Sequence, residues 1–200
     1  MRIQTLHRFL LVATCAALFA AKLPAAESIR ERLSLDSNWR FHLGDIPLDS
    51  FPGGQGVSLY GADITHSGAK AGHVWGGAAR GLDVSNWRQV NLPHDWAVEQ
   101  PFDSKELKQQ GYRPRGIGWY RRSFKLDPSD RGKNLELQFD GVATHCAVYF
   151  NGSRVHHNFC GYTSFHIDVT PMARYGNDEN TIAVRVDADA MEGWWYEGAG

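Results

Sequence analysis

The chain has 200 residues, of which 42% are hydrophobic and 22% charged, a composition typical of globular proteins and not of disordered ones. Its formal net charge is -1, and no basic patch is interleaved with aromatic residues, so nucleic acid is not an expected partner. Seven tryptophans are many for this length, and buried β-structure or sugar binding are the usual reasons for such a number.

The first 26 residues are predicted to be a cleavable secretory signal and no part of the fold. Arg2 and Arg8 precede the apolar run FLLVATCAALFAA, and the small residues of LPAA follow it, as in the three regions of such signals. The run is too short to span a membrane, and no later stretch is long enough either. We therefore expect an exported protein, periplasmic or extracellular, with no membrane partner.

From residue 38 onward, apolar and polar residues alternate with the period of two that is typical of β-strands. Residues 50–84 break this rhythm with nine glycines and are expected to form a long surface excursion. Many short strands without helices between them predict an all-β fold, an antiparallel jelly-roll β-sandwich. The expected strands are NWRFHLGD (38–45), GIGWYRRSFKLD (116–127), NLELQFDG (134–141), HCAVYFNG (145–152), SFHIDVT (164–170) and NTIAVRVDA (180–188).

Two cysteines follow the signal, and export would place them in an oxidising compartment. Asn151-Gly152 is typical of a two-residue hairpin turn, and that register places Cys146 opposite His157. Cys160 then lies about three residues, roughly 10 Å, further along the strand, which is far for a disulfide. Two unpaired thiols are therefore favoured, and a bridge is left open.

The familiar local motifs of catalysis are missing from the sequence. No spacing typical of a metal site, a phosphate-binding loop or a serine nucleophile occurs, so no metal and no cofactor are expected. His94 and Asp95 are adjacent, whereas the members of a catalytic triad usually come from separate segments.

Three corners combine polar and aromatic residues: PHDW (93–96), GYRPRGIGWYRR (111–122) and EGWWYEGAG (192–200). Aromatic faces and carboxylates are the usual components of carbohydrate sites. From residue types alone, the favoured interpretation is nevertheless that Trp96, Trp119 and Trp195 are core anchors whose N–H groups are satisfied by turn carbonyls.

Five motifs in order carry a family resemblance. They are NWRFHLGD (38–45), LDVSNWRQVNLPHDWAVEQ (82–100), GIGWYRRSF (116–124), LQFDGVATHCAVYFNGSRVHHNFCGYTSFHIDVT (137–170) and NTIAVRVDADAMEGWWYEGAG (180–200). Together they resemble the N-terminal sugar-binding, jelly-roll domain of glycoside hydrolase family 2, over nearly all of residues 33–200. That family includes β-galactosidases, β-glucuronidases and β-mannosidases, and the last motif is most similar to exported bacterial β-galactosidase-type members.

The resemblance implies that residues 27–200 are the N-terminal domain of a secreted retaining exo-glycosidase, most similar to a β-galactosidase. An immunoglobulin-like domain and a TIM barrel with both catalytic glutamates would follow, so the 200 residues would be an inactive N-terminal fragment without catalytic residues. The implied partners are a galactoside substrate and the two downstream domains, and a homo-oligomer is left open.

The resemblance also implies sugar contacts in this chain. The residue before the tryptophan of the family's P-x-D/N-W turn reaches the galactose site, and this position is Asp95; a carboxylate can accept hydrogen bonds from two sugar hydroxyls. A second acidic contact precedes the last tryptophan motif, where Glu192 is the nearest carboxylate. His94, Trp195 and Tyr196 complete the expected substrate-binding set, whereas Pro93, Trp96, Trp119 and Arg121 are interpreted as structural, with Arg121 pairing a core carboxylate.

Within the family, a β-glucuronidase or a β-mannosidase is left open beside the β-galactosidase, and two functions of other classes also remain open. The domain could be a free-standing carbohydrate-binding module, because a jelly roll with aromatic corners is typical of those proteins too. It could also be a purely structural domain that packs on a barrel and assists oligomerisation. The two alternatives differ from the enzyme interpretation in whether the isolated chain binds sugar and in whether Asp95 affects turnover.

Overall fold

In the computed structural model, the described residues are 30–46, 76–79, 81–190 and 195–200. The chain divides after Ser34 into two units, and everything below concerns the second, residues 35–200. The predicted signal at residues 1–26 lies outside the described residues. Within the described ranges, no helix is long and apolar enough to cross a membrane.

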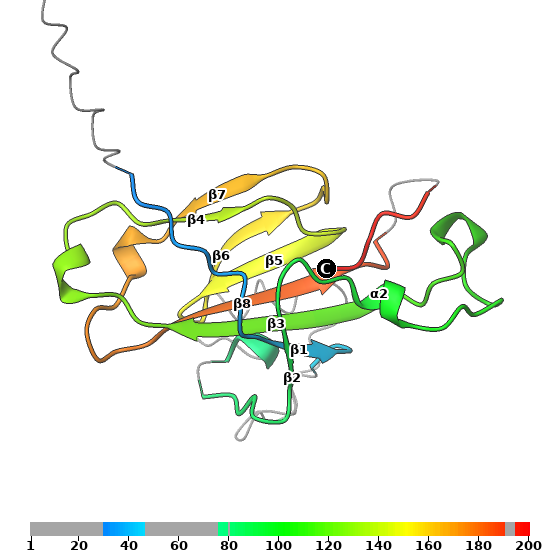
Figure 1. The fold of residues 1–200 in the computed structure, drawn as a ribbon, viewed down its shortest axis with the longest axis horizontal. Helices are drawn as coiled ribbons and strands as arrows, with labels where there is room; N and C mark the ends of the chain where they lie inside the picture. The colour runs from blue at the N-terminus through cyan, green and yellow to red at the C-terminus, as the bar shows by residue number, and fades with distance from the viewer. Residues whose placement is uncertain (1–29, 47–75, 80, 191–194) are drawn as a thin grey trace, which may run out of the picture. The chain divides into compact units, whose positions relative to one another are not determined.

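The described residues of this unit form two antiparallel sheets (Figure 1). The larger has six strands in the order β2-β1-β3-β8-β5-β6, and the smaller pairs β4 with β7. The predicted all-β, antiparallel class is confirmed, whereas the jelly-roll topology stays a prediction. The strands are β1 (Trp39–Leu43), β2 (Arg88–Val90), β3 (Ile117–Phe124), β4 (Glu136–Phe139), β5 (His145–Phe150), β6 (Ser153–Asn158), β7 (Phe165–Asp168) and β8 (Asn180–Asp187).

Helical elements are few and short. The α-helix of the described ranges is α2 (Trp96–Glu99), and single 3₁₀ turns occur at η2 (Gly76–Ala78), η3 (Lys108–Gln110), η4 (Pro128–Asp130) and η5 (Thr170–Met172). A four-residue helix is too short to show a 3.6-residue period, and the sequence pattern therefore did not predict α2.

The main hydrophobic core joins the two sheets, and it follows from the alternation in the sequence. Val148 of β5 and Val184 of β8 lie in one buried cluster with Leu137 of β4 and Ile167 of β7. Successive side chains of a strand point to opposite faces, so each strand places alternate residues in this cluster. The alternation seen in the sequence thus corresponds to residues that enter the core.

A second cluster covers the opposite face of the six-stranded sheet. It contains Trp119 of β3 and Tyr149 of β5, together with Trp87 and Ala78 of η2. A Cβ atom on Gly77 would collide with the Trp119 ring, so the small residues of η2 permit a close approach to the indole. Residues 76–79 are buried, and the expected surface excursion is wrong for this part of 50–84; residues 47–75 lie outside the described ranges.

Arg121 ties the second cluster together. Its buried guanidinium donates to the carbonyl oxygens of Gly77 (2.9 Å) and Ala79 (2.7 Å), and burial lowers its pKa. The structural role expected for Trp119 and Arg121 agrees with these contacts. The predicted partnership of Arg121 with a core carboxylate stays a prediction.

Asp45 fixes the same face from its edge. Its Oδ1 accepts from Trp119 Nε1 (2.9 Å) and its Oδ2 accepts from Arg185 Nη2 (2.8 Å). Burial acts to raise the pKa of Asp45, but the hydrogen bonds from Arg185 and Trp119 outweigh it and leave that pKa below its ordinary value. The Trp119 indole is therefore held by a carboxylate, not by the turn carbonyl expected from the sequence.

The β5–β6 hairpin confirms one local prediction and corrects another. Asn151 and Gly152 form the turn, with φ values of 52° and 84°, the left-handed pair that suits Asn-Gly. A bulge between Val148 and Tyr149 shifts the register by one residue, so Cys146 lies opposite Asn158 and not opposite His157. Both Cys146 and Cys160 are free thiols.

Candidate functional site

The PHDW corner connects β2 to α2, and Asp95 starts the helix. Pro93 follows a cis peptide bond, and Asp95 has extended backbone angles (φ -130°, ψ 106°) as the N-cap residue of α2. Its Oδ1 accepts from the backbone N–H groups of Ala97 (2.9 Å) and Val98 (3.4 Å). A carboxylate at this position satisfies helix donors that have no partner within the helix.

Trp96 anchors the corner in the main core. The residue is fully buried, its indole N–H donates to the carbonyl of Arg115 (2.8 Å), and its ring stacks on Phe41 at 5.5 Å. Trp96 is thus a core anchor as expected, and the carbonyl that accepts from its N–H group belongs to the segment just before β3 and not to a turn. The indole thereby holds the start of α2 against the end of the sheet.

The C-terminal segment 195–200 lies against the same corner. Ala199 accepts a hydrogen bond from the backbone N–H of Trp96 (3.1 Å), and Gly200 exchanges two backbone hydrogen bonds with Ala143 (3.0 and 3.1 Å). The Tyr196 hydroxyl donates to Asp95 Oδ2 (2.6 Å), which joins two predicted site residues that are 101 positions apart. Figure 1 shows the chain end next to α2.

Tyr196 is a hydrogen-bond donor in this arrangement. Burial raises its pKa above the ordinary range, and the hydrogen bond and negative charge of Asp95 raise it further, against the opposing charges of Arg115 and Arg113. The phenol therefore stays protonated at neutral pH. Because Oδ1 of Asp95 serves the helix and Oδ2 receives Tyr196, neither oxygen is without a protein partner.

His94 faces a different set of partners from its neighbour Asp95. Its Nδ1 lies 2.6 Å from the Tyr120 hydroxyl, and its Nε2 lies 2.6 Å from Arg88 Nη2. An arginine only donates, so Nε2 is assigned as the acceptor and Nδ1 as the protonated nitrogen. Burial lowers the pKa of His94 below its ordinary value, although the nearby Glu99 carboxylate acts to raise it. The lowered pKa agrees with a neutral ring.

These contacts define what His94 does in the corner. Its side chain is only 7% exposed, and its ring nitrogens contact Tyr120 of β3 and Arg88 of β2, so the ring ties the PHDW corner to both strands. A catalytic pairing with Asp95, which the sequence spacing disfavours, has no support in these contacts. A direct contact between His94 and sugar stays a prediction.

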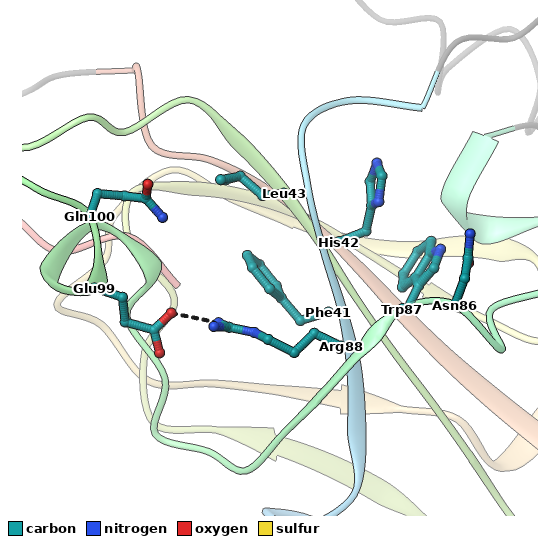
Figure 2. Close-up of a pocket in the computed structure, with 8 residues that line it drawn as sticks. All are labelled: Phe41, His42, Leu43, Asn86, Trp87, Arg88, Glu99 and Gln100. Carbon is teal, nitrogen blue, oxygen red and sulfur yellow. Dashed lines mark hydrogen bonds and ion pairs between the residues drawn. The ribbon is translucent and has the colours of Figure 1, made fainter.

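A cavity of about 250 Å³ lies beside the corner, between β1, β2 and the end of α2 (Figure 2). Arg88 and Glu99 form an ion pair of 2.6 Å at its edge, and the rings of His42 and Trp87 stack at 5.3 Å. Asp95, His94, Trp195 and Tyr196 do not line it. Its residues are Phe41, His42, Leu43, Asn86, Trp87, Arg88, Glu99 and Gln100.

Trp195 differs from the other two tryptophans considered as core anchors. It is 60% exposed, and its indole N–H donates to the hydroxyl of Tyr162 (2.9 Å), which is itself 64% exposed. Trp195 is therefore not a core anchor, and that expectation is wrong. Its predicted role as a pocket wall stays a prediction, and Glu192 lies outside the described residues.

A buried charge pair supports the segment that carries Tyr196. Arg115 and Glu197 have side chains only 4% and 5% exposed, with Nη2 and Oε2 3.9 Å apart. Arg115 Nη2 also donates to Thr144 Oγ1 (2.8 Å) and to the carbonyl of Gly198 (3.2 Å). This pair could not be predicted from the sequence, because its members are 82 residues apart and follow no motif. Among the described residues, no group of three potential metal ligands occurs.

Comparison with known proteins agrees with the fold and with the corner. Residues 88–196 match the family described as the glycosyl hydrolase 2 galactose-binding domain-like family, a match that covers the corner, α2 and Tyr196. The chain therefore belongs to glycoside hydrolase family 2, through its galactose-binding-like N-terminal domain.

Individual relatives are glycosidases of this family. The chain is 35% identical to the β-galactosidase BoGH2A of Bacteroides ovatus over 86% of its length, and 38% identical to a putative β-glucuronidase of Formosa agariphila over 60%. A solved family 2 glycosyl hydrolase from Bacteroides cellulosilyticus is 34% identical over 84% of the chain, with a TM-score of 0.67. The chain spans 17%, 12% and 19% of these three proteins respectively.

Proposed function

We propose that the chain is the N-terminal domain of a secreted retaining exo-glycosidase that hydrolyses β-galactosides, and that Asp95 contacts the sugar. The observation that carries the proposal is the partly exposed Asp95 carboxylate at a rigid corner, in a chain whose relative from Bacteroides ovatus is a β-galactosidase. The proposal includes the jelly-roll topology and the export predicted from the sequence.

In the proposed enzyme, this domain shapes the sugar site and does not perform the bond cleavage. A retaining glycosidase uses one carboxylic acid to protonate the leaving oxygen and one carboxylate to form the glycosyl-enzyme. We assign both to a downstream barrel, as the family resemblance implies. Asp95 then accepts a hydrogen bond from a sugar hydroxyl, an interaction that positions the substrate for those groups.

A β-glucuronidase is the second candidate, and the putative β-glucuronidase of Formosa agariphila favours it. The two candidates differ in the group on C5 of the sugar, a hydroxymethyl or a carboxylate. Among the described residues, the hydrogen-bond partners of the Asp95 carboxylate are neutral, two N–H groups and a phenol. A second carboxylate close to it would be repelled, and this favours the galactoside.

The test is a comparison of aryl β-galactoside and aryl β-glucuronide hydrolysis by the full-length protein encoded by the reading frame that contains this chain. We expect the galactoside to have the higher kcat/KM. A preference for the glucuronide would support the second candidate, and no hydrolysis of either would contradict both.

The isolated 200-residue chain separates the enzyme from a free-standing binding module. In the enzyme interpretation, Asp95 is one part of a divided site, and calorimetry with galactosides should detect no binding. Clear binding with a dissociation constant in the micromolar range would favour the module instead. In the full-length protein, a purely structural domain would leave the kcat/KM of Asp95→Asn unchanged.

A further inference from the structure

Asp95 has less capacity for hydrogen bonds than an isolated carboxylate. A carboxylate offers about four lone-pair positions, two on each oxygen. Two backbone N–H groups occupy Oδ1, at 2.9 and 3.4 Å, and the Tyr196 hydroxyl occupies one position of Oδ2 at 2.6 Å. Counting the partners within the described residues, one acceptor position on Oδ2 is left, so the two sugar contacts expected from the sequence reduce to one.

The donor that fills Oδ2 is held in place by its own segment. The backbone N–H of Glu197 donates to Gln110 Oε1 (3.3 Å), and the carbonyl of Gly198 accepts from Arg115 (3.2 Å). Ala199 is bonded to the N–H of Trp96, directly after Asp95. The phenol and the carboxylate are thus presented by two backbones that are fixed to each other, which limits the freedom of both side chains.

Rotation about the Cβ–Cγ bond of a carboxylate moves both oxygens, so hydrogen bonds to one oxygen alone restrict its plane less than hydrogen bonds to both. The helix donors hold Oδ1, and the phenol at Oδ2 fixes the plane of the group from the other side. We propose that Tyr196 is the positioning residue of the sugar site: its hydroxyl orients Asp95 so that the last acceptor position of Oδ2 receives a single sugar hydroxyl. This inference rests on the proposed function, because it assigns a role within the same site.

A positioning residue differs from a pocket wall in the part of the Tyr196 side chain that acts on the site. A wall would act through its ring, which Tyr196→Phe retains, whereas a positioning residue acts through the oxygen that this substitution removes. The raised pKa of Tyr196 agrees with this role, since a phenol that stays protonated keeps its proton for Asp95. Removal of the hydroxyl leaves Oδ2 without a fixed donor, and the carboxylate can then turn away from the substrate.

The first experiment measures kcat/KM for an aryl β-galactoside with Tyr196→Phe in the full-length protein. We expect a loss of about tenfold, the value of one hydrogen bond to a charged group. Tyr175→Phe is the matched control, because the Tyr175 ring lies under Arg131, 4.8 Å from its guanidinium carbon, in the loop before β8. It should leave kcat/KM unchanged.

The double variant of Tyr196→Phe and Asp95→Asn separates positioning from a general weakening of the fold. Asparagine keeps the helix-capping oxygen, so Asp95→Asn should fold and lose about a hundredfold in kcat/KM. If Tyr196 acts through Asp95, the double variant loses no more than Asp95→Asn alone. Losses that multiply in full would overturn the inference, as would a Tyr196→Phe variant with the kcat/KM of the wild type.

A panel of monodeoxy aryl galactosides tests the single hydroxyl directly. In the wild type, we expect removal of one particular ring hydroxyl to lower kcat/KM. This loss should disappear in Asp95→Asn and become smaller in Tyr196→Phe. Two positions that lose their penalty in Asp95→Asn would show two sugar contacts and would overturn the inference. If Asp95→Asn retains the full kcat/KM of the wild type, the proposed contact between Asp95 and the sugar is wrong. That result differs from one in which only the positioning role of Tyr196 is wrong.

Discussion

Asp45 and Asp95 are two carboxylates at opposite faces of the same sheet, and each stands beside a buried tryptophan. Asp45 binds the Trp119 indole N–H, and Arg185 neutralises it at 2.8 Å. Asp95 precedes Trp96, but its partners are two backbone N–H groups and a phenol, all of them neutral. The first carboxylate is paired with a cation, whereas the hydrogen-bond partners of the second among the described residues are all uncharged.

The difference shows how a fold separates structural carboxylates from candidate binding groups. A charge that meets a cation with several hydrogen bonds has little left to offer a ligand. A charge held by neutral donors keeps an unbalanced field, and a ligand hydroxyl can still interact with it. Proximity to tryptophan therefore does not distinguish the two groups, whereas the nature of their partners does.

The largest expected effect concerns the tryptophan that anchors Asp95. Trp96→Ala should lower the free energy of unfolding by about 3–5 kcal/mol, because it empties a fully buried site and leaves the Arg115 carbonyl without its donor. Urea unfolding of the 200-residue chain measures this loss. Trp195→Ala is the control, and its exposed side chain should cost less than about 1 kcal/mol. Equal losses would show that the corner is not part of the core.

The next prediction compares the effect of the same substitution, aspartate to asparagine, on stability at the two positions. Asp45→Asn should destabilise the chain by about 1 kcal/mol, a value kept low because the side chain of Asp45 is 45% exposed. Asp95→Asn should change the free energy of unfolding by less than about 0.5 kcal/mol, because asparagine is as good an N-cap residue as aspartate. Urea midpoints of the two variants give the comparison, and the reverse order would contradict the assignment of Asp45 as the structural carboxylate.

The smallest effect is a dependence of stability on pH. The pKa of Asp45 in the folded chain lies below its ordinary value of 3.8, so the unfolded chain binds the proton more tightly. Its contribution to stability is therefore present above about pH 4 and is lost as the pH falls through the folded pKa. Thermal midpoints between pH 5 and pH 2.5 should fall less steeply for Asp45→Asn than for the wild type. Parallel curves would show that Asp45 is not held by Arg185 in solution.

Features that depend on neighbouring residues could be predicted from the sequence. The alternation that places Val148 and Val184 in the core is visible within each strand, and the Asn151-Gly152 turn is visible in two residues. The bulge after Val148 is not encoded by such a pattern, and the expected register of Cys146 was wrong by one residue for that reason.

Contacts between segments that are distant in the sequence could not be predicted. Asp95 could be named as a site residue through the family resemblance, but its hydrogen bond with Tyr196 crosses 101 residues and shows no local signal. The burial of Gly77 was missed because a glycine-rich run suggests a loop, whereas here it makes room for the Trp119 ring. The N-cap role of Asp95 was likewise not predicted, because the helix that follows it has only four residues.

The reciprocal backbone bonds between Gly200 and Ala143, together with that from Trp96 to Ala199, have a practical consequence for protein engineering. The corner that carries Asp95 is a composite of the PHDW turn and the last six residues, with Tyr196 in the second piece. A chimera that exchanges only the turn between two family members would join a carboxylate to a foreign donor segment. Successful transfer of sugar preference should require both pieces to move together, as one unit from one parent.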